Sequence, residues 1–131
     1  MKSFDLHVKV ETTEKGFCLI ELSGFLDAHT VNSFESHIES ILKEGRDRLV
    51  IDLKDLHYIS SAGIGSLMSL THHLRKKKGD LVLFRPNPKV YKILDLLGFT
   101  KIFNVALNEE EMKGFLSPHA TEGSPAGGER L

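Results

Sequence analysis

Two adjacent serines, Ser60 and Ser61, stand where the pattern of the chain changes from strand to helix. Before them, residues 49–53 are apolar apart from one aspartate. After them, apolar residues recur at helical spacing from Ile64 to Leu74, including Leu67 and Met68. The first N–H groups of a helix lack intrahelical acceptors, and the helix dipole favours negative charge there. A serine at this point can cap the helix, or it can carry a phosphate that the helix end tolerates.

Catalysis at the same serines has weaker support in the sequence. His29 and His57 could approach Ser61, so a Ser-His-Asp arrangement stays open, but no Gly-x-Ser-x-Gly turn is present. Residues 61–65 lack the lysine of a phosphate-binding P-loop. His72 and His73 are adjacent, which is not metal-ligand spacing on a helix. We therefore expect a protein that is not an enzyme and that has no cofactor and no metal site.

Composition limits the classes of partner. The chain has 131 residues, 27% of them charged, with a net charge of −1, so nothing favours binding to nucleic acid or to an anionic membrane. No apolar run approaches the roughly 18 residues of a membrane span, and the N-terminus does not resemble a signal peptide. Cys18 is the single cysteine and lies in an apolar run, which favours a core position and a reducing compartment. We expect a cytoplasmic protein.

Strands and helices are expected to alternate around the serines. The expected strands cover residues 6–11, 17–22, 49–53, 81–84 and 101–105, with Ser23–Gly24 ending the second and a short polar connection following the third. The expected helices cover residues 31–42, the segment after Ser61, residues 88–97 and the segment after Asn108. Their start signals are Asp27 or Thr30, a serine, Asn87 before Pro88, and Asn108 with Glu111.

This order predicts a single α/β domain over residues 1–116, with a mixed, mostly parallel sheet, an N-terminal β-hairpin and about four helices. Residues 117–131 contain no large apolar residue before the last one, so we predict a disordered C-terminal tail. In open α/β sheets, sites lie at the carboxyl ends of the strands. We expect that edge to gather residues 24–27, 58–61 and 84–88.

The segment Ser-Ser-Ala-Gly-Ile-Gly at residues 60–65 resembles the signature of the STAS domain, the fold of bacterial anti-sigma factor antagonists. The usual form in that family is Asp-Ser-Ser/Thr-Gly-Leu-Gly after a strand. Here Ser60 takes the place of the Asp and Ser61 that of the phosphorylated serine. Ala62 takes the place of the second Ser/Thr, and the remaining positions match as Gly63, Ile64 and Gly65. The resemblance implies that Ser61 is the phosphoacceptor. The departure is the missing Asp, whose role the Ser60 hydroxyl could cover.

A second segment also resembles the family, where Gly-Glu-Leu-Asp is common after the second strand. Residues 24–27 read Gly-Phe-Leu-Asp, so Asp27 matches and Phe25 replaces the Glu. The family associates these acidic residues with the phosphorylation site and nucleotide contacts, and only Asp27 carries over. Phe25 could add to an apolar docking surface or could pack onto the core. The partner-binding residues that we predict are Phe25, Asp27, Ser60, Ser61, Gly63 and Ile64.

The resemblance implies a phospho-regulated binding module. In the unphosphorylated state it would bind an anti-sigma factor that is also a serine kinase and so release a sigma factor. The partner would use the ATP, and a phosphoserine phosphatase would reset the switch. The alternative is a STAS interaction module that binds without phosphorylation in a larger signalling or transport assembly. A third reading is a small hydrolase or nucleotide-using enzyme at the same sheet edge.

Overall fold

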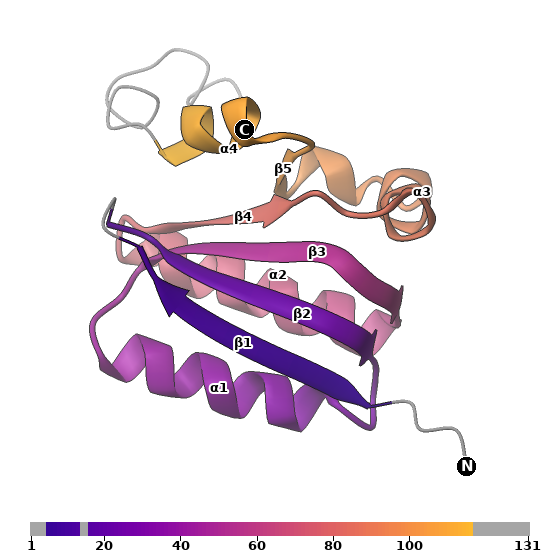
Figure 1. The fold of residues 1–131 in the computed structure, drawn as a ribbon, viewed down its shortest axis with the longest axis horizontal. Helices are drawn as coiled ribbons and strands as arrows, with labels where there is room; N and C mark the ends of the chain where they lie inside the picture. The colour runs from indigo at the N-terminus through magenta and orange to yellow at the C-terminus, as the bar shows by residue number, and fades with distance from the viewer. Residues whose placement is uncertain (1–4, 14–15, 117–131) are drawn as a thin grey trace.

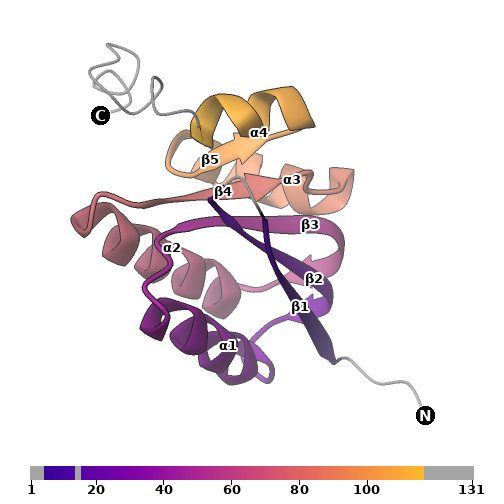
Figure 2. The same cartoon turned by 60° about the vertical axis from the view of Figure 1, so that its left-hand side comes forward.

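The computed structural model describes residues 5–13 and 16–116, which form one five-stranded sheet with helices on its faces (Figures 1 and 2). The strands run in the order β1-β2-β3-β4-β5 across the sheet, and their bounds are β1 Leu6–Thr12, β2 Cys18–Leu26, β3 Arg48–Ile59, β4 Asp80–Phe84 and β5 Asn104–Ala106. The helices are α1 Val31–Lys43, α2 Ser61–Lys76, α3 Pro88–Leu96 and α4 Glu109–Leu116, with a 3-10 turn at Phe99–Lys101. The predicted C-terminal tail lies outside the described residues.

The topology confirms the predicted α/β class. β1 and β2 form the antiparallel N-terminal hairpin, while β2, β3, β4 and β5 pair in parallel. A helix follows each of the parallel strands in the chain, and the connections that pass from one strand to its parallel neighbour are the crossovers that a parallel sheet requires. Because these crossovers direct all four parallel strands the same way, their carboxyl ends share one edge of the sheet.

Helices α1 and α2 cover one face of the sheet, as Figure 1 shows. The main core forms between this face and the two helices, and its fully buried side chains include Ile20, Phe34, Ile51, Leu67 and Leu74. A smaller apolar cluster lies on the other face where α4 packs near β4 and β5, and it contains Val50, Val82, Phe84, Ala106 and Met112. The two layers together bury the central strands on both faces, as the continuous apolar run of β3 predicts.

β2 and β3 are longer than predicted. β2 continues through Ser23–Gly24, where the pairing with β3 shifts register and Gly24 has a φ of +105°. β3 continues through residues 54–57, which we had expected to be a polar connection. Polar residues tolerate a strand here because Lys54, Asp55, His57 and Tyr58 are exposed. Both strands therefore carry their carboxyl ends well beyond the point where β4 stops.

We had also expected residues 84–88 at the sheet edge with residues 58–61. This prediction is wrong because β3 extends well beyond the end of β4. β3 pairs with β4 only as far as Asp52 opposite Phe84, seven residues before β3 ends at Ile59. The segment after β4 instead lies along the second half of β3, where the Asn87 side-chain amide donates to the carbonyl oxygens of Leu56 and Lys54. Of the parallel strands described, β2 and β3 are thus the ones that reach the sheet edge near Ser61.

Two of the predicted helix starts are confirmed in atomic detail. Asn87 accepts from the Val90 N–H at 3.1 Å, with Pro88 in the first turn of α3. Asn108 accepts from the Glu111 N–H at 2.9 Å.

Two other features differ from the prediction. Met68 is exposed, although we had placed it on the apolar face of its helix, and Leu70 is buried instead. The last strand begins at Asn104 because the preceding residues form the 3-10 turn.

One ion pair joins the chain after β4 to β3. Asp52 is 2% exposed, and its Oδ2 lies 2.6 Å from Nη2 of Arg85, whose guanidinium also lies over the Phe84 ring at 4.6 Å. The hydrogen bond from Arg85 to the Asp52 carboxylate raises the pKa of Arg85. The other carboxylate oxygen of Asp52 accepts from the Lys54 N–H at 3.0 Å. The carboxylate is therefore buried but compensated on both oxygens.

This pairing predicts a specific pattern of stabilities. Arg85→Ala leaves the Asp52 carboxylate buried without its cation, and we expect a loss of about 1–3 kcal/mol in the free energy of unfolding, a range that allows for the partial exposure of Arg85. Adding Asp52→Asn removes the buried charge while keeping an acceptor for Lys54, so the double variant should be more stable than Arg85→Ala alone. Urea denaturation measures both. A double variant less stable than the single one would contradict the assignment.

Candidate functional site

Ser61 is the first residue of α2 and is exposed to solvent. Ser60 precedes it as the N-cap, with extended backbone angles (φ −96°, ψ 176°). The Ser60 Oγ accepts from the Gly63 N–H at 3.3 Å, and the Ser60 carbonyl oxygen accepts from the Ile64 N–H at 2.9 Å. The two serines therefore have different roles. Ser60, which takes the place of the family's Asp, caps the helix, and the Ser61 hydroxyl is left for other chemistry.

The open end of α2 favours an anion next to Ser61. Ser60 satisfies the N–H groups of Gly63 and Ile64, which leaves the N–H groups of Ser61 and Ala62 at the tip of the helix. The positive end of the helix dipole lies at the same place. No acidic residue occupies the first turn of α2. A phosphate on the Ser61 hydroxyl would meet a favourable field without displacing a carboxylate of this turn.

The start of α2 rests directly on the end of β2. The Ser60 N–H donates to the Leu26 carbonyl oxygen at 3.0 Å, so the cap is tied to the neighbouring strand. Gly63 lies so close that a Cβ there would be 2.8 Å from the same oxygen and 2.9 Å from the Leu26 Cγ. A Cβ at Gly65 would instead meet nothing within 4 Å. Of the two glycines, only Gly63 is required for this close approach.

Asp27 shapes the turn that leads from β2 into α1. Its Oδ1 accepts from the N–H groups of His29 at 2.9 Å and Thr30 at 3.2 Å. We had predicted Asp27 or Thr30 as the cap of α1. Thr30 holds the N-cap position, but its side chain makes no capping bond to the helix, and the Asp27 carboxylate serves the backbone before it. Asp27 thus lies one residue beyond Leu26, at the same sheet edge as Ser60.

Thr30, predicted only as a possible helix cap, also holds the turn beside the site. It is 8% exposed, and its hydroxyl donates to the Phe25 carbonyl oxygen at 2.7 Å and accepts from the Asp27 N–H at 3.0 Å. These bonds close the loop between β2 and α1 into a fixed turn. The spacing Asp-x-x-Thr before a helical pattern could have indicated such a turn.

Phe25 fits both of the roles considered for it. It is half-buried, lies opposite Tyr58 in the pairing of β2 with β3, and its ring centroid is 6.0 Å from that of His57 at an interplanar angle of 45°. Tyr58 is 44% exposed. Phe25, His57 and Tyr58 therefore place aromatic surface on the paired ends of β2 and β3, just before Ser60.

The six residues that we predicted for partner binding separate into two groups. Phe25, Asp27, Ser60 and Ser61 lie at the paired ends of β2 and β3 or in the residues that directly follow them, and they are exposed or half-buried. Gly63 and Ile64 are buried, the latter at 4% exposure, so they support this surface from below and are not open to direct contact.

Three features of the described residues bear on the alternative functions. No hydrogen bond between Ser61 and His29 or His57 is found in the part of the chain that the structure describes, and the His57 ring packs on Phe25 instead. Residues 5–13 and 16–116 contain no group of three His, Cys, Asp or Glu side chains placed to hold a metal ion. None of the helices described is long and apolar enough to cross a membrane.

Cys18 is buried, as predicted, and this burial raises the pKa of its thiol.

Comparison with known proteins gives consistent results. The STAS domain family model matches residues 8–112. The protein BtrV of Bordetella bronchiseptica is 33% identical over 95 residues, which are 72% of this chain and 82% of that protein. The anti-sigma F factor antagonist of Paenibacillus polymyxa is 29% identical over 106 residues, which are 80% of this chain and 90% of that protein.

Solved structures show the same fold. An anti-sigma factor antagonist from Mycobacterium paratuberculosis superposes with a TM-score of 0.75 at 22% identity, covering 86% of this chain and 95% of that one. The Bacillus cell fate determinant SpoIIAA in its phosphorylated form superposes with a TM-score of 0.64 at 21% identity, covering 85% of this chain and 100% of that one.

The two glycines of α2 provide a matched test of the contact between α2 and β2. Gly63→Ala should lower the free energy of unfolding by about 1–3 kcal/mol, because the new methyl group meets the backbone of β2. Gly65→Ala should be neutral or raise it by up to about 1 kcal/mol, because alanine is the better helix former and the site is open. Urea denaturation measures the free energy of unfolding of both variants. Equal changes for Gly63→Ala and Gly65→Ala would show that the close approach of α2 to β2 is not a constraint.

The division of roles between the serines is tested in the same way. Ser60→Ala should cost about 1 kcal/mol of stability through the lost cap, whereas Ser60→Asp should retain it because aspartate is an equally good cap. Ser61→Ala should change stability by less than about 0.5 kcal/mol, as expected at an exposed position that makes no cap. If Ser61→Ala were the more destabilising of the two alanine variants, the cap would be misassigned.

Proposed function

The chain belongs to the STAS domain family, and from that premise we propose that it is an anti-sigma factor antagonist switched by phosphorylation of Ser61. In the unphosphorylated state it binds an anti-sigma factor and so releases a sigma factor. The observation that supports the proposal is that Ser60, and not Ser61, caps α2. Ser60 provides the helix cap, so the exposed Ser61 hydroxyl can be modified without loss of the capping bond.

The proposed docking surface extends from Ser61 over the neighbouring exposed groups. Gly65 and Met68 follow Ser61 at helical spacing and are exposed, with Met68 at 38%. Phe25 and Tyr58 add aromatic area at the ends of β2 and β3. Bare glycine backbone beside scattered apolar side chains suits close contact with a partner. A phosphate in the middle of this area would lie inside the interface.

The charge of the phosphate explains the direction of the switch. It adds about −1.5 to −2 charges at neutral pH. The helix end stabilises this charge in the free protein, so the fold survives phosphorylation. In the complex the same charge would have to lose its water against an apolar contact, which costs free energy unless the partner supplies a cation. Binding therefore falls on phosphorylation, while the free protein stays folded.

The enzymes that act on Ser61 belong to the same proposal. The anti-sigma factor is the serine kinase and uses the ATP, and a separate phosphoserine phosphatase restores the binding state. Ser60 stands where the family has an Asp, and its hydroxyl, fixed by the Gly63 N–H, keeps that position polar. Asp27 retains one carboxylate oxygen beyond its bonds to the turn and can contact the kinase or its nucleotide. The chain itself is a binding protein in this scheme, with no catalytic residue of its own.

A module that binds without phosphorylation is the second candidate. Phe25 replaces one acidic residue of the family pattern and Ser60 replaces another, so two groups associated with the phosphorylation site are missing. In this version the same surface binds its partner constitutively, and Ser61 is an exposed contact residue. The two candidates differ in how binding responds to a negative charge at Ser61.

The proposed switch predicts opposite behaviour of two Ser61 variants towards the anti-sigma factor kinase encoded in the same genome. Ser61→Ala should bind as the unphosphorylated protein does and should stay bound when ATP is added. Ser61→Asp should bind roughly 10- to 100-fold more weakly, because an unpaired carboxylate at an apolar contact costs about 1–3 kcal/mol. Calorimetry or surface plasmon resonance measures the affinities, and circular dichroism checks the fold.

A charge placed elsewhere serves as the control. Ser36 is exposed on α1, outside the proposed surface, and Ser36→Asp adds the same charge. It should leave the affinity unchanged. Equal binding by the wild type and Ser61→Asp, with both variants folded, would reject the switch and favour the module that binds without phosphorylation.

A further inference from the structure

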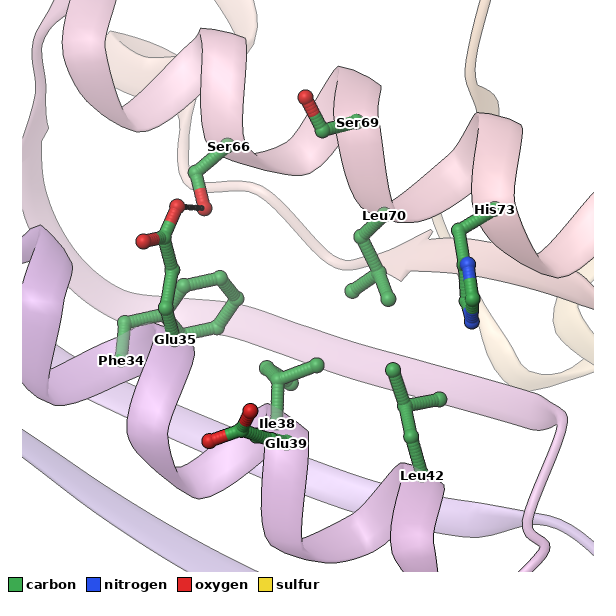
Figure 3. Close-up of a pocket in the computed structure, with 9 residues that line it drawn as sticks. All are labelled: Phe34, Glu35, Ile38, Glu39, Leu42, Ser66, Ser69, Leu70 and His73. Carbon is green, nitrogen blue, oxygen red and sulfur yellow. Dashed lines mark hydrogen bonds between the residues drawn. The ribbon is translucent and has the colours of Figure 1, made fainter.

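α1 and α2 leave a groove between them on the side facing away from the sheet, with a volume of about 220 Å³ (Figure 3). Its floor is apolar and is formed by Phe34, Ile38 and Leu42 of α1 and by Leu70 of α2. Phe34, Ile38 and Leu70 belong to the main core and are almost fully buried, and Leu42 packs against it. The groove is therefore an apolar depression in the helical layer. It shares no lining residue with the surface proposed for the Ser61 switch, although Ser69 on its α2 rim lies one helical turn beyond Gly65.

The rims of the groove are polar and differ in character. Glu35 and Glu39 line the α1 side, and Ser69 and His73 line the α2 side. At one end the Ser66 hydroxyl donates to Glu35 Oε2 at 2.8 Å, which bridges the two helices and closes the groove there (Figure 3). At the other end the side chains of Leu42 and His73 point toward each other across the groove (Figure 3).

The two glutamates give the groove a charge pattern with a fixed repeat. They are the full charges among its lining residues, with His73 counted as neutral, and they stand four residues apart on α1. Four residues correspond to about 6 Å along a helix, so the two carboxylates lie one turn apart on one rim. The floor runs from Phe34 to Leu42, which corresponds to about 12 Å, or two helical turns.

We propose that this groove binds a basic amphipathic helix of a protein partner. An apolar stripe of that helix packs on the floor between α1 and α2, as in other complexes where a helix lies in a groove. Lysine or arginine side chains one turn apart on one flank of that helix pair with Glu35 and Glu39, so charge complementarity requires that this flank be basic. The proposal does not rest on Ser61 or on its phosphorylation.

Two labelled model peptides test the chemistry of the occupant against the full-length protein. Both are helical peptides of about three turns with a leucine stripe, and one carries two lysines one turn apart where the other carries two glutamates. We expect the lysine peptide to bind about tenfold more tightly than the glutamate peptide, since two attractive pairs become two repulsive ones. Fluorescence anisotropy measures affinity, and NMR shifts of the Ile38 and Leu70 methyl groups locate the site.

A charge-reversal pair on the protein provides the control. Glu39→Lys should weaken binding of the lysine peptide and strengthen that of the glutamate peptide. Glu110→Lys makes the same change on the exposed side of α4, remote from the groove, and should alter neither. Methyl shifts confined to the groove floor, at Ile38, Leu42 and Leu70, would support the proposal if Glu39→Lys, but not Glu110→Lys, reverses the preference between the peptides.

Equal affinity for the two peptides, no detectable binding of either, or identical behaviour of Glu39→Lys and Glu110→Lys would overturn the proposal. So would a wild-type dimer in sedimentation that Leu42→Glu dissociates, because the occupant of the groove would then be a second copy of this chain.

Discussion

The close approach of α2 to the end of β2 is the constraint on which the site depends. Gly63 leaves no room for a side chain above Leu26, and the Ser60 N–H bonds to the same residue's carbonyl oxygen. Together these contacts fix where the helix begins and therefore which serine is its cap and which is its first residue. A helix that began one residue later would make Ser61 the cap and would occupy its hydroxyl. The position of one backbone segment thus decides the chemistry available to Ser61.

Placing a modifiable hydroxyl at a helix start separates the stability of the fold from the affinity for a partner. The helix end favours negative charge, so phosphorylation does not oppose folding. The surface around Ser61 carries apolar side chains beside the Asp27 carboxylate, from Phe25 and Tyr58 on the strands to Met68 on α2. A phosphate on Ser61 would therefore oppose association. A regulatory phosphate needs both properties at once. A charge in the core would unfold the domain, and a charge on a remote surface would leave binding unchanged.

Much of the fold could be predicted because the alternation of apolar patterns and the caps at Asn87 and Asn108 are local signals. The length of β3 could not be predicted in this way. Residues 54–57 are mostly exposed and show no strand pattern, and they remain extended because β2 pairs with them. The Asp52–Arg85 and Glu35–Ser66 contacts join residues 33 and 31 positions apart, so no short window of sequence contains them. For the site, the sequence of residues 60–65 indicated the place, whereas only the structure shows that Ser60, and not Ser61, caps α2.

The most direct measurement is site-resolved phosphopeptide mapping of the protein taken from its native cells, before and after stress, beside Ser60→Ala and Ser61→Ala variants. A switch at Ser61 predicts a phosphate on that residue whose occupancy changes with conditions, is retained in Ser60→Ala and disappears in Ser61→Ala. A phosphate on Ser60 instead, or none on either serine under any condition, would contradict the assignment of Ser61 as the acceptor.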